Sequence, residues 1–393
     1  MKLRLQFMGL SVLVAAAVLG ACGGGGGGSS SDSNASNALT PSQISAITAA
    51  QIAAYSDAQV SALSTDIKYL SDSALQALTA GTNASHPSGQ IESITAAQIA
   101  AMSPAQIRMI GAAGPGGSVT TSQIQYLNTG AWAALVSNPV QVAAITAAEV
   151  PTLWDAEIIA FGTNINALSN AALNALTYAT LAGNVNRNIG QIESITVAQI
   201  AAMSPAQVRM IGAAGPGGSV TTSQIQYLNS GAWASLVSSP AQVAAITAAE
   251  VATLWDVEIV ALGTNINALS NAALNALSYT TVTNLQHNIG QIESITTAQI
   301  AAMSPAQVSI LAGITSNFGA STAIAWLNSG AFSTLSSTQV AALIPVNMLG
   351  VSPTQLASLT TAAIAGFSSA TIASLTVQQR SSLSSAQHTA CGC

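Results

Sequence analysis

A short repeat of about eight residues dominates the sequence, and each unit carries its own helix-start signal. A unit reads as a large apolar residue, Ser or Thr, two variable residues, Gln, and then Ile or Val, as in Ile47–Ile52. Ser or Thr followed three residues later by Gln or Glu is a capping box, in which each side chain accepts a hydrogen bond from the backbone amide of the other residue. The apolar residues on either side of the box, Ile47 and Ile52, are spaced to form a hydrophobic staple.

The capping box recurs along most of the chain, and proline supports the predicted helix starts. Several prolines directly follow a Ser or Thr cap, at the first helical position, where a missing N–H costs nothing. The boxes include Thr40/Gln43, Thr48/Gln51, Thr95/Gln98, Ser103/Gln106, Thr120/Gln123, Thr146/Glu149, Ser352/Gln355 and Thr376/Gln379. The prolines are Pro41, Pro104, Pro205, Pro240, Pro305 and Pro353.

The eight-residue period predicts short helices instead of one continuous helix. In a continuous helix the apolar stripe would drift by about 80° with each unit, whereas a new cap in every unit resets the chain direction. Helices of one to two turns are too short to be stable alone, since about 12–15 residues are needed, so they must stack on neighbours. The sequence therefore predicts an all-α solenoid of short capped helices.

A longer repeat of about 100 residues encloses the short one. The segment Gly89–Thr95 recurs from Gly190 and again from Gly290, and the third copy then diverges, as expected where stacking stops. We divide the chain into N-terminal octads at 39–88, long repeats at 89–189 and 190–289, a divergent third repeat with its cap at 290–387, and a Cys-Gly-Cys tail at 388–393.

The N-terminal segment has the features of an export signal. Lys2 and Arg4 precede an apolar stretch too short to span a bilayer, and small residues precede Cys22. Leu19–Cys22 resembles the lipobox of bacterial lipoproteins, which implies that a signal peptide, 1–21, is removed and that Cys22 carries lipid such as palmitate. An ordinary secretory signal with a chance cysteine is the alternative.

Residues 22–38 are rich in Gly and Ser and are predicted to be a flexible tether between the lipid and the repeats. The protein is accordingly expected to be exported and anchored to the bacterial outer membrane. Whether it faces the periplasm or the cell surface is left open by the sequence.

The octads resemble the tandem repeats of large secreted bacterial proteins that are labelled adhesion or haem-utilisation proteins. The pattern Leu/Ile-Thr-x-x-Gln-Ile/Val carries this resemblance over most of 39–387. With the lipid anchor, this leads us to predict a non-enzymatic, structural or adhesive role in the envelope or matrix. The membrane is one expected partner, through the lipid, and a surface glycan, matrix or envelope protein is another. The residues themselves give no support to haem binding, so no cofactor is predicted.

Composition argues against nucleic acid as a partner and against catalysis. Charged residues make up 5% of the chain, against about 25% in ordinary soluble domains, and the net charge is −6. A chain with seven Lys and Arg residues lacks the basic patch that nucleic acids require. No nucleophile is paired with a base, so no catalytic residue and no enzymatic activity are predicted.

Other candidate ligands have plain explanations. His86, His287 and His388 do not recur at equivalent positions, so no triad or zinc site is predicted. Three recurring methionines occupy apolar positions and are assigned to the core, and the two glycine-rich loops lack the lysine of a phosphate-binding loop. The methionines are Met102, Met203 and Met303, and the loops are Ala113–Ser118 and Ala214–Ser219.

Two equivalent clusters place a tryptophan beside acidic residues. They consist of Trp154, Asp155 and Glu157, and of Trp255, Asp256 and Glu258. One interpretation is a ligand-contact site, either a sugar-stacking platform or a weak calcium site. The plainer one is a core tryptophan followed by an Asp helix cap and a first-turn Glu.

Cys391 and Cys393 are close enough in sequence to form a local disulfide, with an intermolecular disulfide or a thiol–metal bond as alternatives. A similar Cys-x-Cys ending occurs in some secreted functional-amyloid subunits, which gives an amyloid-like matrix subunit as a further alternative function. The in-phase caps and prolines argue against cross-β structure.

Overall fold

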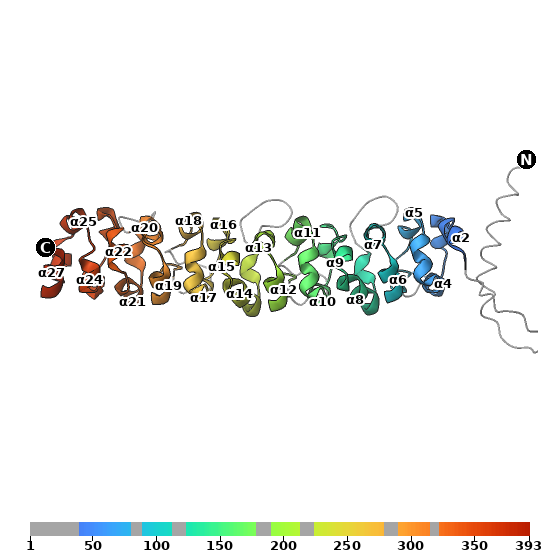
Figure 1. The fold of residues 1–393 in the computed structure, drawn as a ribbon, viewed down its shortest axis with the longest axis horizontal. Helices are drawn as coiled ribbons and strands as arrows, with labels where there is room; N and C mark the ends of the chain where they lie inside the picture. The colour runs from blue at the N-terminus through green and yellow to red at the C-terminus, as the bar shows by residue number, and fades with distance from the viewer. Residues whose placement is uncertain are drawn as a thin grey trace, which may run out of the picture. The chain divides into compact units, whose positions relative to one another are not determined.

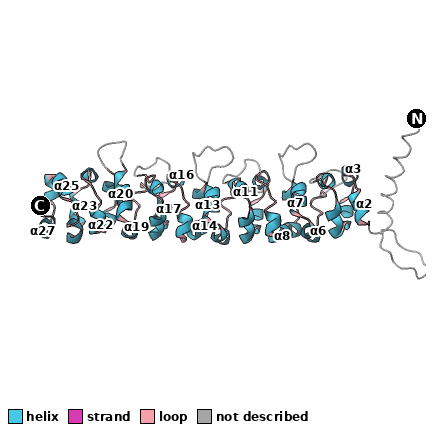
Figure 2. Cartoon of the chain, turned by 45° about the horizontal axis from the view of Figure 1, so that its top comes forward, coloured by secondary structure: helices cyan, strands magenta, loops and turns pink. Residues whose placement is uncertain are grey.

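The computed structural model describes residues 39–79, 89–111, 123–177, 190–212, 224–278, 290–314 and 322–393. The chain divides into two compact units, of which the first ends at Ile145 and the second begins at Thr146. Every regular element in these described residues is a helix, as Figure 1 and Figure 2 show. The predicted all-α fold is confirmed.

The first unit consists of short α-helices interrupted by two 3₁₀ helices. The α-helices are α2 (Pro41–Ser45), α3 (Ala49–Ile52), α4 (Asp57–Ala62), α5 (Asp72–Leu75), α6 (Ala96–Ala101), α7 (Pro104–Gly111), α8 (Thr129–Ser137) and α9 (Pro139–Val142). The 3₁₀ helices are η1 (Ser64–Tyr69) and η2 (Ile124–Tyr126).

The second unit repeats this construction over a longer stretch of chain. Its α-helices are α10 (Asp155–Ala160), α11 (Asn170–Asn174), α12 (Val197–Ala202), α13 (Pro205–Gly212), α14 (Ser230–Val237), α15 (Pro240–Val243), α16 (Ala248–Val251), α17 (Asp256–Ala261), α18 (Asn271–Leu274), α19 (Thr297–Ala302), α20 (Pro305–Gly313), α21 (Ser329–Ser333), α22 (Ser337–Ala341), α23 (Pro353–Ser358), α24 (Thr361–Ile364), α25 (Ser369–Ser374), α26 (Val377–Ser381) and α27 (Ser385–Cys391). Its 3₁₀ helices are η3 (Val150–Thr152), η4 (Gly162–Ala167), η5 (Ile225–Tyr227), η6 (Gly263–Ala268), η7 (Ala323–Trp326) and η8 (Pro345–Met348).

The helices begin where the capping boxes predict. At α3 the backbone N–H of Gln51 donates to Thr48 Oγ1 over 3.3 Å, and the N–H of Thr48 donates to Gln51 Oε1 over 2.9 Å. The flanking Ile47 and Ile52 are buried, as a staple requires. Each of the six predicted prolines is the first residue of its helix, and α23 to α27 begin at eight-residue intervals.

Two of the predicted boxes are not followed by a described α-helix. Thr120 lies outside the described residues. At Thr146 the backbone N–H donates to Glu149 Oε2 over 2.6 Å, but a turn and η3 follow in place of an α-helix. Pro151 has no N–H to donate, whereas the equivalent Ala252 donates to Ala248 O over 3.1 Å and closes α16.

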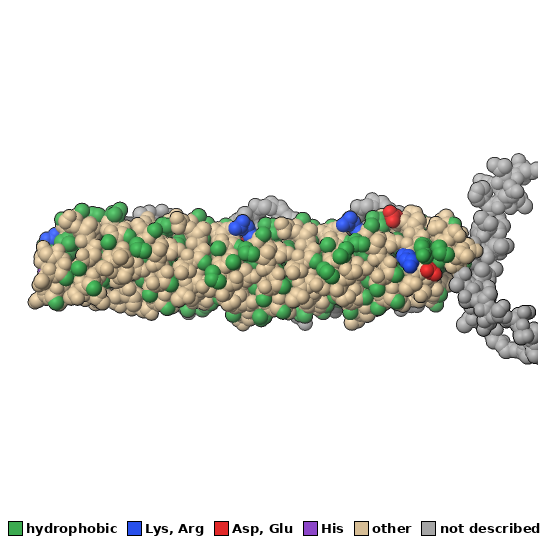
Figure 3. All heavy atoms as spheres, in the orientation of Figure 1, with side chains coloured by type: hydrophobic (Ala, Val, Ile, Leu, Met, Phe, Trp, Pro, Cys, Tyr) green, Lys and Arg blue, Asp and Glu red, His purple; other side chains and the backbone are tan. Residues whose placement is uncertain are grey.

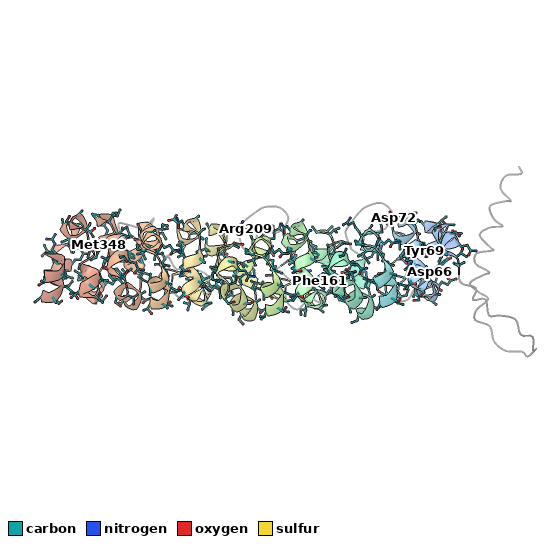
Figure 4. All side chains as sticks on the ribbon, viewed as in Figure 1. Asp66, Tyr69, Asp72, Phe161, Arg209 and Met348 are labelled. Atoms are coloured by element: carbon teal, nitrogen blue, oxygen red, sulfur yellow. A yellow bond between two sulfur atoms is a disulfide. The ribbon has the colours of Figure 1, made fainter. Side chains whose placement is uncertain are left out.

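Within each unit the short helices form successive turns of the array, called coils below, and each coil stacks on the one before it. In the first unit α6 packs against α8 and α5 against α7, and in the second α12 packs against α14, α20 against α22 and α22 against α24. The core is made of the staple residues and of the large side chains that close each coil, among them Phe161, which is 1% exposed (Figure 4). This stacking is the arrangement expected of a solenoid within each unit.

The capping-box glutamines have a second role that the sequence did not reveal. Gln98 Oε1 accepts from the N–H of Thr95 over 2.8 Å, while Gln98 Nε2 donates over 2.8 Å to the carbonyl of Val60, one coil earlier. One side chain therefore caps its own helix and bonds the preceding coil. Bridges to an earlier coil are also made by Gln141, Gln199, Gln242, Gln299, Gln339, Gln355, Gln379 and Gln387.

An asparagine makes a parallel set of bridges. Asn128 Oδ1 caps α8, and its Nδ2 donates to the carbonyls of Glu92 and Ile94 over 2.8 and 2.6 Å. Asn229 and Asn328 do the same in the second unit. Because each net hydrogen bond contributes about 0.5–1.5 kcal/mol, these repeated amide bonds stabilise the coil junctions that they cross.

Candidate functional site

The two Trp/acidic clusters lie at the starts of α10 and α17. Trp255 is itself the cap residue of α17, with extended backbone, and its side chain makes no capping bond. The cap is completed by Glu258, whose Oε2 accepts from the N–H of Trp255 over 2.8 Å. Trp154 and Glu157 repeat this arrangement at 2.7 Å.

This geometry corrects the plain interpretation of the clusters. The cap is the tryptophan and not the aspartate, because Asp155 and Asp256 are the first residues inside their helices. The tryptophans are half-buried, not fully enclosed in the core. An aromatic surface therefore stays accessible at both positions, while the Glu beside it points inward.

Glu258 is a buried residue that is only 7% exposed. Burial raises the pKa of Glu258 from 4.5 to about 7, and the hydrogen bond from the Trp255 amide opposes this rise. Near neutral pH this carboxyl is therefore part protonated. Because its Oε2 atom already caps α17, Glu258 has a structural role in the helix. Trp255 and Asp256 are the residues of the cluster that remain accessible to a ligand.

A second buried glutamate lies at the start of α16. Glu250 Oε2 accepts from the N–H of Thr247, and burial raises the pKa of Glu250, with the Thr247 bonds and the Arg209 charge opposing the rise. Its other oxygen faces Gly212, where an added Cβ would lie 1.6 Å away. Glycine at 212 leaves room for this carboxylate, so the pair is a packing feature of the coil junction.

The recurring methionines belong to the core, as predicted. Met102, Met203 and Met303 are buried at helix ends. Their backbone carbonyls accept the bridging amides of the next coil, at 2.7–2.9 Å. Their role is structural.

Several predicted features lie outside the described residues. They are the signal peptide 1–21, Cys22, the tether 22–38, both glycine-rich loops, His86 and His287. In the ranges that are described, no helix is long and apolar enough to cross a membrane.

Cys391 and Cys393 are joined by a disulfide. The predicted tail 388–393 starts inside α27, which continues to Cys391. His388 lies at the same corner, with Nδ1 at 2.9 Å from the carbonyl oxygen of Cys393 and 3.9 Å from its sulfur. This is the one group of three metal-ligating side chains found among the described residues.

The described residues thus define an all-α repeat protein whose coils are joined by side-chain amides. No protein-family model matches the chain, and a search of curated proteins finds no match. The resemblance to bacterial lipoproteins and to adhesion-type repeats stays a prediction.

Proposed function

We propose that the protein is a non-enzymatic structural or adhesive repeat protein of the bacterial envelope, attached to a membrane through lipid on Cys22. The observation that carries this proposal is that the polar side chains of the repeats are engaged in structural hydrogen bonds. Gln and Asn residues of the repeats cap helices and join coils, as Gln98 and Asn128 do, and Glu residues such as Glu258 cap helices. The exposed residues include many Ala, Ser and Thr residues together with several large apolar ones.

The outer surface is better suited to contact with another surface than to catalysis. On the face drawn in Figure 3, charged side chains are few. Exposed apolar residues recur at equivalent positions, since Ile159 on α10 is 48% exposed and Val260 on α17 is 43% exposed. Many weak, equal contacts of this kind give avidity to a surface that binds another surface.

Deletion of one long repeat, 190–289, tests the adhesive role. The deletion joins two copies of the same motif, so the protein should stay helical and exported. Attachment of cells or of purified protein to a matrix should weaken by degrees, as expected when some of many equal contacts are lost. Complete loss of attachment with the helical circular dichroism spectrum intact would instead locate one specific site in that repeat.

The anchor is tested separately by Cys22→Ala. If Cys22 carries the lipid, the variant should leave the membrane fraction, while a matched Ser29→Ala variant in the tether should remain in it. Equal membrane retention of the wild type and of Cys22→Ala would refute the lipid anchor. Protease treatment of intact cells then distinguishes a surface position from a periplasmic one.

A glycan- or protein-binding module is the second candidate, and the half-buried tryptophans favour it. Val257 beside Trp255 is 62% exposed, so an aromatic ring and an apolar neighbour are both accessible at the start of α17. Replacing Trp154 and Trp255 together by Ala should abolish glycan binding if they form the platform. The amyloid-like alternative has less support, because the described residues contain no strand.

A further inference from the structure

The end of α27 brings three side chains with metal-binding atoms to one corner. His388 and Cys391 are three residues apart and so lie on the same face of the helix. Gly392 then adopts a left-handed conformation, with φ of 66°. This turns the chain back, and the N–H of Cys393 donates to the carbonyl of His388 over 3.3 Å.

The distance between His388 and Cys393 at this corner is close to that of a metal site, whereas the two sulfurs, which are bonded to each other here, separate when the disulfide is reduced. His388 Nδ1 and the sulfurs of Cys391 and Cys393 all lie within 4.8 Å of one another. In a tetrahedral zinc site, bonds of about 2.3 Å to sulfur and about 2.0–2.1 Å to nitrogen place the two ligand atoms about 3.6 Å apart. The Nδ1 to Cys393 sulfur distance of 3.9 Å is within a few tenths of an ångström of that value.

The corner does not depend on the disulfide to stay in place. Ser384 and Gln387 form a capping box at the start of α27, and Gln387 Nε2 donates to the carbonyls of Ala357 and Leu359 over 3.0 and 2.7 Å. These bonds fix the helix to the preceding coil. His388 and Cys391 lie on α27 and therefore stay in place whether or not the cysteines are bonded to each other. Cys393 lies beyond the helix and is held beside them by its N–H bond to the His388 carbonyl.

We propose that the reduced corner binds a thiophilic divalent cation such as Zn²⁺ through His388, Cys391 and Cys393, and that disulfide formation releases it. A dithiol reductant breaks the Cys391–Cys393 bond by thiol–disulfide exchange and becomes a disulfide itself. Each cysteine thiol then loses its proton to solvent as its sulfur binds the cation. Two-electron oxidation by another disulfide, which takes up two protons and becomes two thiols, re-forms the Cys391–Cys393 bond and releases the ion.

Three protein ligands leave the fourth tetrahedral position open. A water molecule or a ligand from another molecule completes the site. The corner is thus a redox-controlled metal site of the two-cysteine, one-histidine kind.

The test uses the full-length chain, reduced with a dithiol that is then removed without oxygen. Zn²⁺ is titrated in competition with a chromophoric chelator, and Cd²⁺ is used in parallel to detect sulfur-to-metal charge-transfer absorption. The reduced protein should bind one ion per chain at this site, and the oxidised protein none. Cys393→Ser should abolish the site. His388→Ala removes a direct ligand and should weaken Zn²⁺ binding by about 10–100-fold or more, because the loss of a group that only hydrogen-bonds a ligand already has an effect of that size.

The matched control is the double variant Cys391→Ser and Cys393→Ser. It retains Cys22, His86 and His287 and so reports binding elsewhere on the chain, while an unchanged helical circular dichroism spectrum shows that the array is folded. The proposal is overturned if reduced wild type binds no more Zn²⁺ than this control. It is equally overturned if His388→Ala binds Zn²⁺ as tightly as the wild type, with the same Cd²⁺ spectrum.

Discussion

Replacing Glu258 by Gln should make the protein less sensitive to pH. The pKa of Glu258 rises from 4.5 in the unfolded chain to about 7 in the folded one, because burial disfavours the carboxylate. The folded state therefore holds a proton that the unfolded state releases. The stability that this proton contributes is fully present below about pH 4.5 and is lost as pH rises through about 7.

The size of the effect follows from the same two pKa values. At about 1.4 kcal/mol for each pH unit, the whole contribution is about 3 kcal/mol, and about 2 kcal/mol of it disappears between about pH 5.5 and pH 8.5. Gln cannot ionise, but its Oε1 can still accept from the Trp255 N–H. The stability of Glu258→Gln relative to the wild type should thus increase by about 2 kcal/mol over this range.

Urea denaturation followed by circular dichroism measures the difference at each pH. The range stays above the sequence isoelectric point of about 4.8, where solubility is lowest. Glu293→Gln, the same substitution at a partly exposed glutamate, is the matched control. A constant difference between Glu258→Gln and the wild type from pH 5.5 to pH 8.5 would refute the assigned role of burial.

The remaining predictions concern the coil junctions, and urea denaturation checks each of them. Gln199→Glu should cost about 1–3 kcal/mol at neutral pH, because a carboxylate can cap Thr196 but cannot donate to the preceding coil; an unchanged midpoint would show that the bridge adds nothing. Thr196→Ala removes the other half of this box and should cost about 0.5–2 kcal/mol, which a stability equal to the wild type would contradict. Gly366→Ala should cost about 1–3 kcal/mol, because its Cβ would lie 2.2 Å from the backbone oxygen of Ser337. Gly313→Ala in α20 meets no atom within 4 Å and should stabilise by about 0.4–1 kcal/mol, so equal effects of the two glycine substitutions would argue against this packing.

The helix starts could be predicted because a capping box is a local interaction. Thr48 and Gln51 lie three residues apart, and their bonds need nothing from the rest of the chain. At Thr146 the bond from the Thr146 N–H to the Glu149 carboxylate also forms, but no α-helix follows because Pro151 interrupts the hydrogen bonds. The proline could have been weighed against the box from the sequence alone.

The bridges between coils were missed because their acceptors are backbone carbonyls far along the chain. Val60, the acceptor for Gln98, has no side-chain feature that marks it. One signal was available. Glu serves a capping box as well as Gln does, so the prevalence of Gln at this position indicates a need for the N–H₂ group as a donor.

The Trp/acidic clusters were assigned the wrong cap for a related reason. Asp is a preferred cap residue and Trp is not, so local preference selects Asp256. In the folded unit the staple residues Leu254 and Ile259 are buried on either side, and this packing places Trp255 at the cap. Tertiary burial therefore overrides the local preference at this position.

The glutamine bridges give the array a direction. In the part of the chain that the structure describes, each bridge from a Gln amide to a backbone carbonyl runs toward the N-terminus, as from Gln387 to Leu359 and from Gln379 to Val351. In these glutamine bridges the earlier coil supplies the carbonyl and the later coil supplies the amide donor, which must be satisfied when it is buried. Because the ribosome synthesises the chain from its N-terminus, each coil is made before the coil that follows it. The carbonyls of the earlier coil can therefore accept hydrogen bonds from the glutamine amides of the later one.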